Sequence, residues 1–195
     1  MFFVYCAAAY LLGSLSPSII QGRLKGIDIR KQGSGNPGTT NMLRVMGLQS
    51  ALITLTLDVL KGVAAVSLGR LHSPLCAYIC AVAVFAGHLW PCFYGFKGGK
   101  GVATAFGAIL AVSPVIALSC LALTLAVIAL SRFVSAGSLC GALMSPILAV
   151  WLKPDFLIEA LIITALIFIK HKENIKRLLA GEESAISFKR EKHDE

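Results

Sequence analysis

Two short polar clusters in this sequence carry the residue types that bind phosphate groups. They are GSGNPGTTN at residues 33–41 and FKGGKGVAT at residues 96–104. Glycines let backbone N–H groups approach an anion closely. Ser, Thr and Asn add hydrogen-bond donors, and lysine adds positive charge. Because both clusters lie between long apolar stretches, the pattern predicts that a phosphorylated group is bound where a fatty chain can also reach.

Neither cluster fits a nucleotide-binding motif. Residues 33–38 match G-x-G-x-x-G, and Asp58 lies twenty residues beyond Gly38. That fingerprint requires a preceding β-strand in a βαβ unit, whereas an apolar, helix-length stretch precedes this cluster and Asp58 falls within the next one. Residues 95–100 are one residue short of a P-loop, and Gly101 stands where Ser or Thr is required. Both clusters are therefore interpreted as general anion-binding loops, with a plain flexible loop as the alternative.

Three further side chains could serve a phosphate-bearing site. Arg44 follows Asn41 by three residues, and its planar fork suits bidentate phosphate binding, although a snorkelling membrane anchor is the alternative. His171 and Asn174 are spaced i,i+3 and share one face of a helix. A histidine can act there as base or as donor, and an interfacial, solvated histidine is the alternative.

The apolar stretches contain few charged or titratable groups. Asp58 and Lys61 are spaced i,i+3, so they can neutralise each other within the membrane. We interpret them as a structural pair, although charges inside a membrane are often functional. His88, just before Pro91, is interpreted as an interfacial histidine rather than a catalyst. Because the spans and their connections hold so few acids, a carboxylate cage for Mg²⁺ is hard to assemble, and we expect neither metal nor cofactor.

Composition indicates a membrane protein. Of the 195 residues, 56% are hydrophobic and only 14% charged, and the mean hydropathy is +0.78. Several stretches approach the roughly 20 residues that a helix needs to span a bilayer. Residues 1–20 lack a basic region and a clear cleavage site, so they are predicted to be the first span rather than a signal peptide. The net charge of +8 is attributed to membrane topology, and no nucleic acid is expected.

The six cysteines lie inside or just beyond apolar stretches. Cys76 and Cys80 are spaced i,i+4 and can share a helix face, but no His or carboxylate nearby completes a zinc-type set. All six are interpreted as small apolar packing residues.

We predict an all-α membrane protein with seven transmembrane helices in a single domain, residues 1–195. The stretch 102–130 would make a helix of about 43 Å, which exceeds a hydrocarbon core of about 30 Å. Ser113-Pro114 near its middle is predicted to break it into two helices. The predicted spans are 1–20, 48–69, 74–90, 101–113, 115–131, 135–152 and 155–170.

The distribution of basic residues predicts the orientation. With seven spans and the N-terminus outside, fifteen of the 18 Lys and Arg residues lie inside, with only Arg70 and Lys153 outside and Lys61 within a span. Six spans would place Arg132 and the basic tail on the opposite side from the glycine-rich loops. The positive-inside rule therefore favours seven spans and a cytoplasmic C-terminus. Both glycine-rich clusters, the turn 131–138 and the tail 171–184 then meet at the cytoplasmic face.

In order and spacing, four motifs resemble a known family. They are GSGNPGTTNMLRVMG, GFKGGKGVAT, SRFVSAGS and HKENIKRLLAGEE, and they are similar to those of the bacterial acyl-phosphate:glycerol-3-phosphate acyltransferases of the PlsY type. The likeness extends from Leu11 to about Glu183. It implies an enzyme of the bacterial cytoplasmic (inner) membrane with its active face to the cytoplasm. The implied reaction transfers a fatty acyl group from acyl phosphate to sn-glycerol 3-phosphate, giving lysophosphatidate and phosphate.

The resemblance also implies site residues and partners. The expected partners are the two substrates, the lipid bilayer and a soluble acyltransferase that forms the acyl phosphate; no acyl-CoA is expected as donor. Glu183 is implied to be structural. The residues expected to be catalytic are Ser34, Arg44, Lys100, His171 and Asn174. Those expected to bind substrate are Gly33, Gly35, Asn36, Gly38, Thr40, Asn41, Lys97, Gly98, Gly99, Gly101, Thr104, Arg132, Ser135 and Ser138.

Two other functions fit parts of the pattern. A transporter for a phosphorylated metabolite could use the same cationic loops, but alternating access places the site near the membrane midplane, whereas these clusters share one face. A membrane scaffold would leave the glycine-rich loops unexplained. For the enzyme, Ser34 is expected to donate a hydrogen bond rather than act as a nucleophile, because no base is evident beside it. Either His171 or a substrate phosphate is expected to take the acceptor proton.

Overall fold

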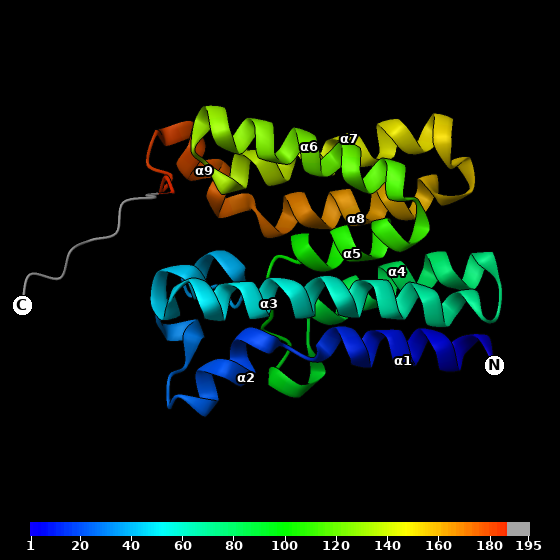
Figure 1. The fold of residues 1–195 in the computed structure, drawn as a ribbon, viewed down its shortest axis with the longest axis horizontal. Coiled ribbons are helices and arrows are strands. Elements are labelled where there is room, and N and C mark those ends of the chain that lie inside the picture. Colours follow the sequence, from blue (N-terminus) through cyan, green and yellow to red (C-terminus); the bar gives the residue numbers. More distant parts are fainter. Residues whose placement is uncertain (187–195) are drawn as a thin grey trace, which may run out of the picture.

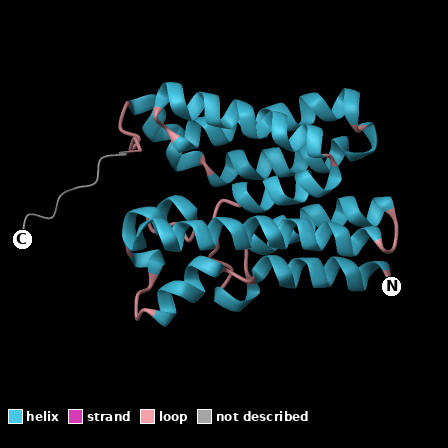
Figure 2. Ribbon diagram, viewed as in Figure 1, coloured by secondary structure: helices cyan, strands magenta, loops and turns pink. Residues whose placement is uncertain are grey.

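The computed structural model describes residues 1–186 and contains helices but no strand in that part of the chain (Figure 2). The α-helices are α1 Phe2–Ser14, α2 Pro17–Leu24, α3 Thr39–Arg70, α4 Pro74–Leu89, α5 Val102–Val112, α6 Pro114–Ser131, α7 Val134–Leu152, α8 Leu157–Lys170 and α9 Lys172–Ala180. Three short 3₁₀ helices are η1 Ile29–Lys31, η2 Cys92–Tyr94 and η3 Pro154–Phe156.

The long helices lie side by side along one axis of the molecule (Figure 1). One group contains α1, α3 and α4, and a second contains α6, α7 and α8, with α5 between them. The helix α5 packs on both α3 and α6 and so joins the two groups. The apolar core runs along these contacts and includes Phe85, Ile116 and Phe156 among its fully buried side chains.

Four helical segments are long and apolar enough to cross a membrane, namely α3, α4 with η2 (Pro74–Tyr94), α6 and α7. The pair α1 and α2 passes the same criterion together but is bent by 41° at Leu15-Ser16, within the predicted span 1–20. The helices α5 and α8 have only 11 and 14 residues. At about 1.5 Å per residue, 11 residues cover about 17 Å, so the seven spans and the orientation of the termini stay predictions.

The predicted break at Ser113-Pro114 is present. The helix α5 ends at Val112 and α6 begins at Pro114. Ser113 is extended and caps α6, because its side chain accepts a hydrogen bond from the amide of Ile116 at 3.5 Å.

The two cations that were predicted to lie outside, Arg70 and Lys153, are at the end of the bundle opposite the start of α3. Arg70 and Lys153 line one pocket of about 210 Å³ together with Tyr78. Three of the fifteen cations that were predicted to lie inside, Lys189, Arg190 and Lys192, are outside the described residues.

Cysteines occupy the apolar core. Cys76, Cys80 and Cys120 are buried there, and Cys6 packs against it. The sulfur atoms of Cys6, Cys76 and Cys80 lie within 4.8 Å of one another, so α1 contributes a third thiol that the i,i+4 spacing did not predict. Gly69 leaves room for this group, since a Cβ atom there would lie 2.8 Å from the Cys80 sulfur.

Glycines let the helices approach closely. A Cβ atom at Gly107 of α5 would lie 2.9 Å from the Cα atom of Val59 on α3, and one at Gly62 of α3 would lie 2.7 Å from the amide nitrogen of Ala108. Small residues at helix contacts are the usual means of close packing in membranes. The α3–α5 contact matters for function because both helices begin at the polar loops.

We therefore expect Gly107→Val to destabilise the fold. The added atoms would collide with the backbone of α3, which costs about 1–3 kcal/mol in a well-packed interior. The midpoint of thermal unfolding in detergent should fall, measured with a dye that reacts with thiols as they become exposed. Ala126→Val, at an exposed position of α6, is the control and should leave the midpoint nearly unchanged. Equal midpoints for both variants would contradict the close packing.

Candidate functional site

Four polar segments lie toward one end of the bundle, on the left of Figure 1, with the second of them further inward than the other three. They are residues 33–47, 95–101, 131–138 and 171–184, and we call this region the polar end. The structure thus brings together the segments that were predicted to converge.

The first loop is built around the side chain of Asn41. Its Oδ1 accepts a hydrogen bond from the Ser34 amide at 2.8 Å, and its Nδ2 donates to the carbonyls of Ile29 and Gln32 at 3.2 and 3.0 Å. Asn41 is buried, whereas Ser34 is exposed. Gly33 has a φ of 57°, a left-handed conformation that glycine adopts at little cost. The amide of Asn41 therefore shapes the loop, while the Ser34 hydroxyl faces solvent.

The first loop leads directly into the start of α3. Gly38 is the N-cap and the helix begins at Thr39, so its first N–H groups lack partners within the helix and can bind an anion. Arg44 is exposed on this segment. At Gly47, with a φ of 80° and a ψ of −179°, α3 is kinked. The kink separates the segment that carries Asn41 and Arg44 from the long apolar part of the helix.

The second loop packs against the first. Gly99 is buried, and a Cβ atom there would lie 2.9 Å from the carbonyl oxygen of Pro37 and would also meet the His88 ring. The amide of Gly99 donates to the His88 carbonyl at 3.2 Å. Gly101, with a φ of 80°, is the N-cap of α5. Gly99 is thus required by close approach, and Lys100 projects from a tightly held backbone.

Lys100 connects the second loop to the C-terminal segment. Its ammonium group donates a hydrogen bond to Oδ1 of Asn174. The pKa of Lys100 is lowered to about 8, chiefly by burial; the nearby Glu183 carboxylate opposes this shift, and the charges of Arg177 and Arg44 add to it. Cations from three separate segments therefore act on one another at this point. Such a concentration of positive charge favours an anionic ligand.

Glu183 organises the C-terminal half of the site. Its Oε1 accepts hydrogen bonds from Ser135 Oγ at 2.7 Å and from Asn174 Nδ2 at 2.6 Å, and its Oε2 accepts from Arg177 Nε at 2.8 Å. Burial alone would raise the pKa of Glu183, but these hydrogen bonds outweigh it and hold the pKa below its ordinary value. Gly181, with a φ of 72°, ends α9 and turns the chain back so that Glu183 reaches this position.

His171 lies between α8 and α9 and is buried. Its Nδ1 lies 2.8 Å from the carbonyl oxygen of Ile167. Because a carbonyl only accepts, Nδ1 carries the proton and Nε2 is left as the acceptor of the neutral ring. The pKa of His171 is lowered to about 4, chiefly by burial; the hydrogen bond to the Ile167 carbonyl opposes this shift, and the charge of Lys100 adds to it. The ring is therefore neutral at pH 7.

Several other expected site residues have their polar atoms engaged within the protein. Thr104 is fully buried and its hydroxyl lies 3.2 Å from His88 Nδ1. Ser138 is buried and donates to the carbonyl of Val134 at 2.8 Å. Lys97 differs from these residues, because it is exposed on the second loop.

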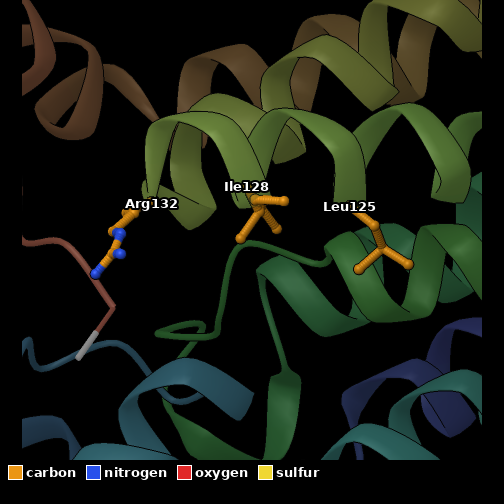
Figure 3. Close-up of a pocket in the computed structure, with 4 residues that line it drawn as sticks. Leu125, Ile128 and Arg132 are labelled. Atoms are coloured by element: carbon orange, nitrogen blue, oxygen red, sulfur yellow. The ribbon is translucent and has the colours of Figure 1, made fainter. Parts of the chain in front are cut away.

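Arg132 ends α6 in a left-handed conformation, with a φ of 64°. It lines a groove of about 380 Å³ with Leu125, Ile128 and Ala129. In Figure 3 the side chains of Leu125, Ile128 and Arg132 extend from the same side of α6. The carbonyl of Arg132 also accepts a hydrogen bond from the amide of Ile186 at 2.9 Å. An apolar groove thus ends at a guanidinium group of the polar end.

Sequence reasoning missed the part played by Arg177 and gave Glu183 no specific contact. Both lie in the quoted tail motif, where a glycine follows the predicted helix and suggests a reversal of the chain. The spacing of six residues places them on no common helix face, so their ion pair could be found only from the fold.

Comparison with known proteins identifies the family. A family profile described as glycerol-3-phosphate acyltransferase matches residues 3–181. The glycerol-3-phosphate acyltransferase of Clostridioides difficile (strain 630) is 46% identical over 199 residues, covering 97% of this chain and 98% of that protein. The protein of the same name from Shewanella halifaxensis (strain HAW-EB4) is 45% identical over 190 residues, covering 96% of each.

The chain belongs to the glycerol-3-phosphate acyltransferase family. A crystal structure of PlsY (YgiH), an integral membrane glycerol 3-phosphate acyltransferase, in its glycerol 3-phosphate form has a TM-score of 0.92 at 36% identity, covering 95% of this chain and 96% of that chain. The lysophosphatidic acid form of PlsY has a TM-score of 0.89 at 35% identity, covering 95% of each. The predicted family and the all-helical membrane fold are thereby confirmed.

The state of His171 can be tested in this family member. We expect the histidine side-chain nitrogen NMR spectrum to show the Nδ1–H tautomer, with protonation of the ring only near pH 4. Because the folded pKa lies below the unfolded value of about 6.5, the unfolded chain binds more protons between these pH values. The contribution of His171 to stability is therefore complete above about pH 6.5 and is lost as the pH falls toward 4.

His171→Asn identifies the resonance and serves as the control. An Nε2–H tautomer, or protonation of the ring near pH 6.5, would contradict the assigned geometry.

Proposed function

We propose that this family member transfers a fatty acyl group from acyl phosphate to the 1-hydroxyl of sn-glycerol 3-phosphate. The products are lysophosphatidate and inorganic phosphate. The observation that carries the proposal is the position of Lys100. It directly follows Gly99, which packs against Pro37 of the other anion-binding loop, and it donates a hydrogen bond to Asn174 of the C-terminal segment. A single cation is thus placed to reach two phosphate-bearing substrates.

The site faces the cytoplasm of a bacterial inner membrane in this proposal. Seven spans with the N-terminus outside would place the polar end inside, which agrees with the excess of basic residues there. The opposite end carries Arg70 and Lys153. The whole chain then forms one multi-pass domain.

Charge repulsion between the substrates explains the need for a cationic site. Two unit charges about 4 Å apart repel by about 4 kcal/mol at an effective dielectric constant near 20. Arg44 and Lys100 offset this repulsion and hold the reacting groups in line. Ser34, exposed beside the start of α3, donates a hydrogen bond to a phosphate oxygen. The phosphate of the donor is already a good leaving group, so no covalent enzyme intermediate is required.

The groove on α6 is assigned to the acyl chain of the donor. Leu125, Ile128 and Ala129 provide an apolar surface that ends at Arg132. An acyl phosphate is complementary to this arrangement, because its hydrocarbon chain is followed by an anionic group. The chain would lie along the membrane while its phosphate reaches the polar end.

The acceptor is assigned to the C-terminal half of the site. Asn174 and Ser135 are held by Glu183, and the Nε2 atom of His171 can accept a hydrogen bond from the acceptor hydroxyl. A group whose pKa is about 4 is a weak base at neutral pH, whereas a phosphate monoester has a second pKa of about 6. We therefore assign removal of the proton to a substrate phosphate and orientation of the acceptor to His171.

The remaining expected residues are proposed to shape or line the two phosphate sites. Asn41 and Thr104 act from buried positions. Ser138 lies on α7, about one helical turn after Ser135. The proposed binding residues of the loops are Gly33, Gly35, Asn36, Gly38, Thr40, Lys97, Gly98, Gly99 and Gly101. No metal or cofactor is assigned to the reaction, and a soluble acyltransferase that forms acyl phosphate is proposed as the supplier of the donor.

A direct assay tests the proposal. Purified protein in detergent is incubated with palmitoyl phosphate and labelled glycerol 3-phosphate, without CoA or acyl carrier protein, and labelled lysophosphatidate should form. Lys100→Ala should lower the rate by about 10²–10³-fold, the scale for removal of one preorganised electrostatic donor. Lys176→Ala, which removes an exposed cation of α9, should keep nearly full activity.

Full activity of Lys100→Ala would reject its role. Uptake of glycerol 3-phosphate into vesicles without product would instead support a transporter, for which the comparisons provide no support.

The groove assignment makes a separate prediction. Ala129→Trp would fill the groove with an indole ring, so the KM for palmitoyl phosphate should rise about tenfold or more while that for a short-chain acyl phosphate changes less. Ala126→Trp, on the same helix but outside the lining, is the control. Equal effects of Ala129→Trp on long and short donors would place the acyl chain elsewhere.

A further inference from the structure

A cluster of buried charged and polar groups lies directly beneath the second loop. Asp58 and Lys61 of α3 form an ion pair of 2.8 Å, as their spacing allows, and His88 of α4 joins them. The Nδ1 atom of His88 lies 3.3 Å from Asp58 Oδ1 and 2.9 Å from Lys61 Nζ. Asp58 is 2% exposed, and Lys61 and His88 are each 6% exposed. His88 is therefore an interior residue and not the interfacial one that its position before Pro91 suggested.

Lys61 connects the cluster to the first two helices. Its ammonium group donates to the carbonyls of Gly13 and Leu15 at 3.0 and 2.8 Å. These carbonyls lie at the end of α1, where the chain bends by 41° before α2 begins at Pro17. The segment α2 leads through η1 into the first phosphate-binding loop. The bend that directs this segment is thus held by a buried cation.

His88 connects the cluster to the second loop. Its Nδ1 atom faces Asp58 and Lys61, whereas its Nε2 atom lies against Gly99, because a Cβ atom at Gly99 would meet it. The His88 carbonyl accepts the hydrogen bond from the Gly99 amide. The side chain of Thr104, at the start of α5, also reaches His88 Nδ1 at 3.2 Å. Both ends of the loop segment 98–104 therefore rest on this one histidine.

We propose that Asp58, Lys61 and His88 act as a positioning cluster that holds the second loop, and with it the Lys100 ammonium group, in place relative to the first loop. None of the three needs to contact substrate for this role. Neutralising a pair of charges requires only Asp58 and Lys61. The additional contacts of Lys61 with Gly13 and Leu15, and of His88 with Thr104 and Gly99, connect α1, α3, α4 and α5 and the second loop, which is more than neutralisation requires. The proposal rests on the proposed function for its kinetic test but not for its structural one.

The test compares variants that remove the cluster without leaving a single buried charge. The double variant Asp58→Asn/Lys61→Met keeps the interior neutral. Thr104→Val removes one contact to His88 and introduces no charge. Thr164→Val is the matched control, because its hydroxyl is also buried and donates to the Ala142 carbonyl on the distant α7–α8 contact.

Two measurements are made on folded protein in detergent. Hydrogen–deuterium exchange of a peptide covering residues 95–101 reports the hydrogen bond of the Gly99 amide, with residues 171–183 as internal reference. Steady-state kinetics provide the KM for palmitoyl phosphate and for glycerol 3-phosphate separately. We expect about tenfold faster exchange in the loop and about a tenfold higher KM for the donor in the double variant. Because Lys100 is placed to reach both substrates, the KM for glycerol 3-phosphate should rise as well, whereas exchange of the reference peptide should change less than about twofold.

The outcomes are distinct. If the double variant does not fold, the comparison of Thr104→Val with Thr164→Val tests the proposal instead. Thr104→Val should speed hydrogen–deuterium exchange of residues 95–101, and Thr164→Val should not. Unchanged loop exchange in a folded cluster variant would overturn the proposal. A fall in kcat with both KM values unchanged would also overturn it, since that result indicates only a smaller folded fraction. If the wild-type protein forms no lysophosphatidate, the proposed function fails while the exchange result still decides on the positioning cluster.

Discussion

The constraint on which this structure depends is that charge inside a membrane helix must be neutralised. Asp58 and Lys61 are almost completely buried, and removing one partner of such a pair leaves an unpaired charge that costs about 3–5 kcal/mol. Their 2.8 Å contact meets this requirement. The same lysine satisfies carbonyl groups at the end of α1, where the helix stops making its own hydrogen bonds. The side chain of Lys61 therefore both balances the charge of Asp58 and stabilises the bend of the chain.

At the polar end, the backbone and the side chains have different roles. In the two loops, glycines allow the backbone to pack closely. The side-chain amide of Asn41 holds the first loop through its hydrogen bonds to the backbone. In the C-terminal half, Glu183 does the corresponding work by accepting from Ser135, Asn174 and Arg177. Lys100 joins the halves through Asn174. The exposed groups Ser34 and Arg44 are thus left free to meet a ligand.

Much of the fold and part of the site could be predicted from local patterns. The break at Ser113-Pro114 followed from helix length and from proline chemistry, whereas the phosphate-binding character of the loops, inferred from residue type, stays a prediction. The bend after Ser14 was not predicted, although Pro17 begins α2 just beyond it, and the kink at Gly47 was not predicted because a single glycine does not by itself end a helix. The interior position of His88 was also missed, since a residue near a helix end can face either water or a neighbouring helix.

By itself, the sequence determined that this is a helical membrane protein of a recognisable acyltransferase family, because hydrophobicity, glycine content and motif order are properties of the chain alone. It also determined the i,i+3 pair of Asp58 and Lys61. Only the tertiary structure decided which groups touch across long separations, such as Lys100 with Asn174 and Lys61 with His88. The physical reason is that helix periodicity fixes neighbours within a few residues, whereas contacts between helices depend on how whole helix faces pack.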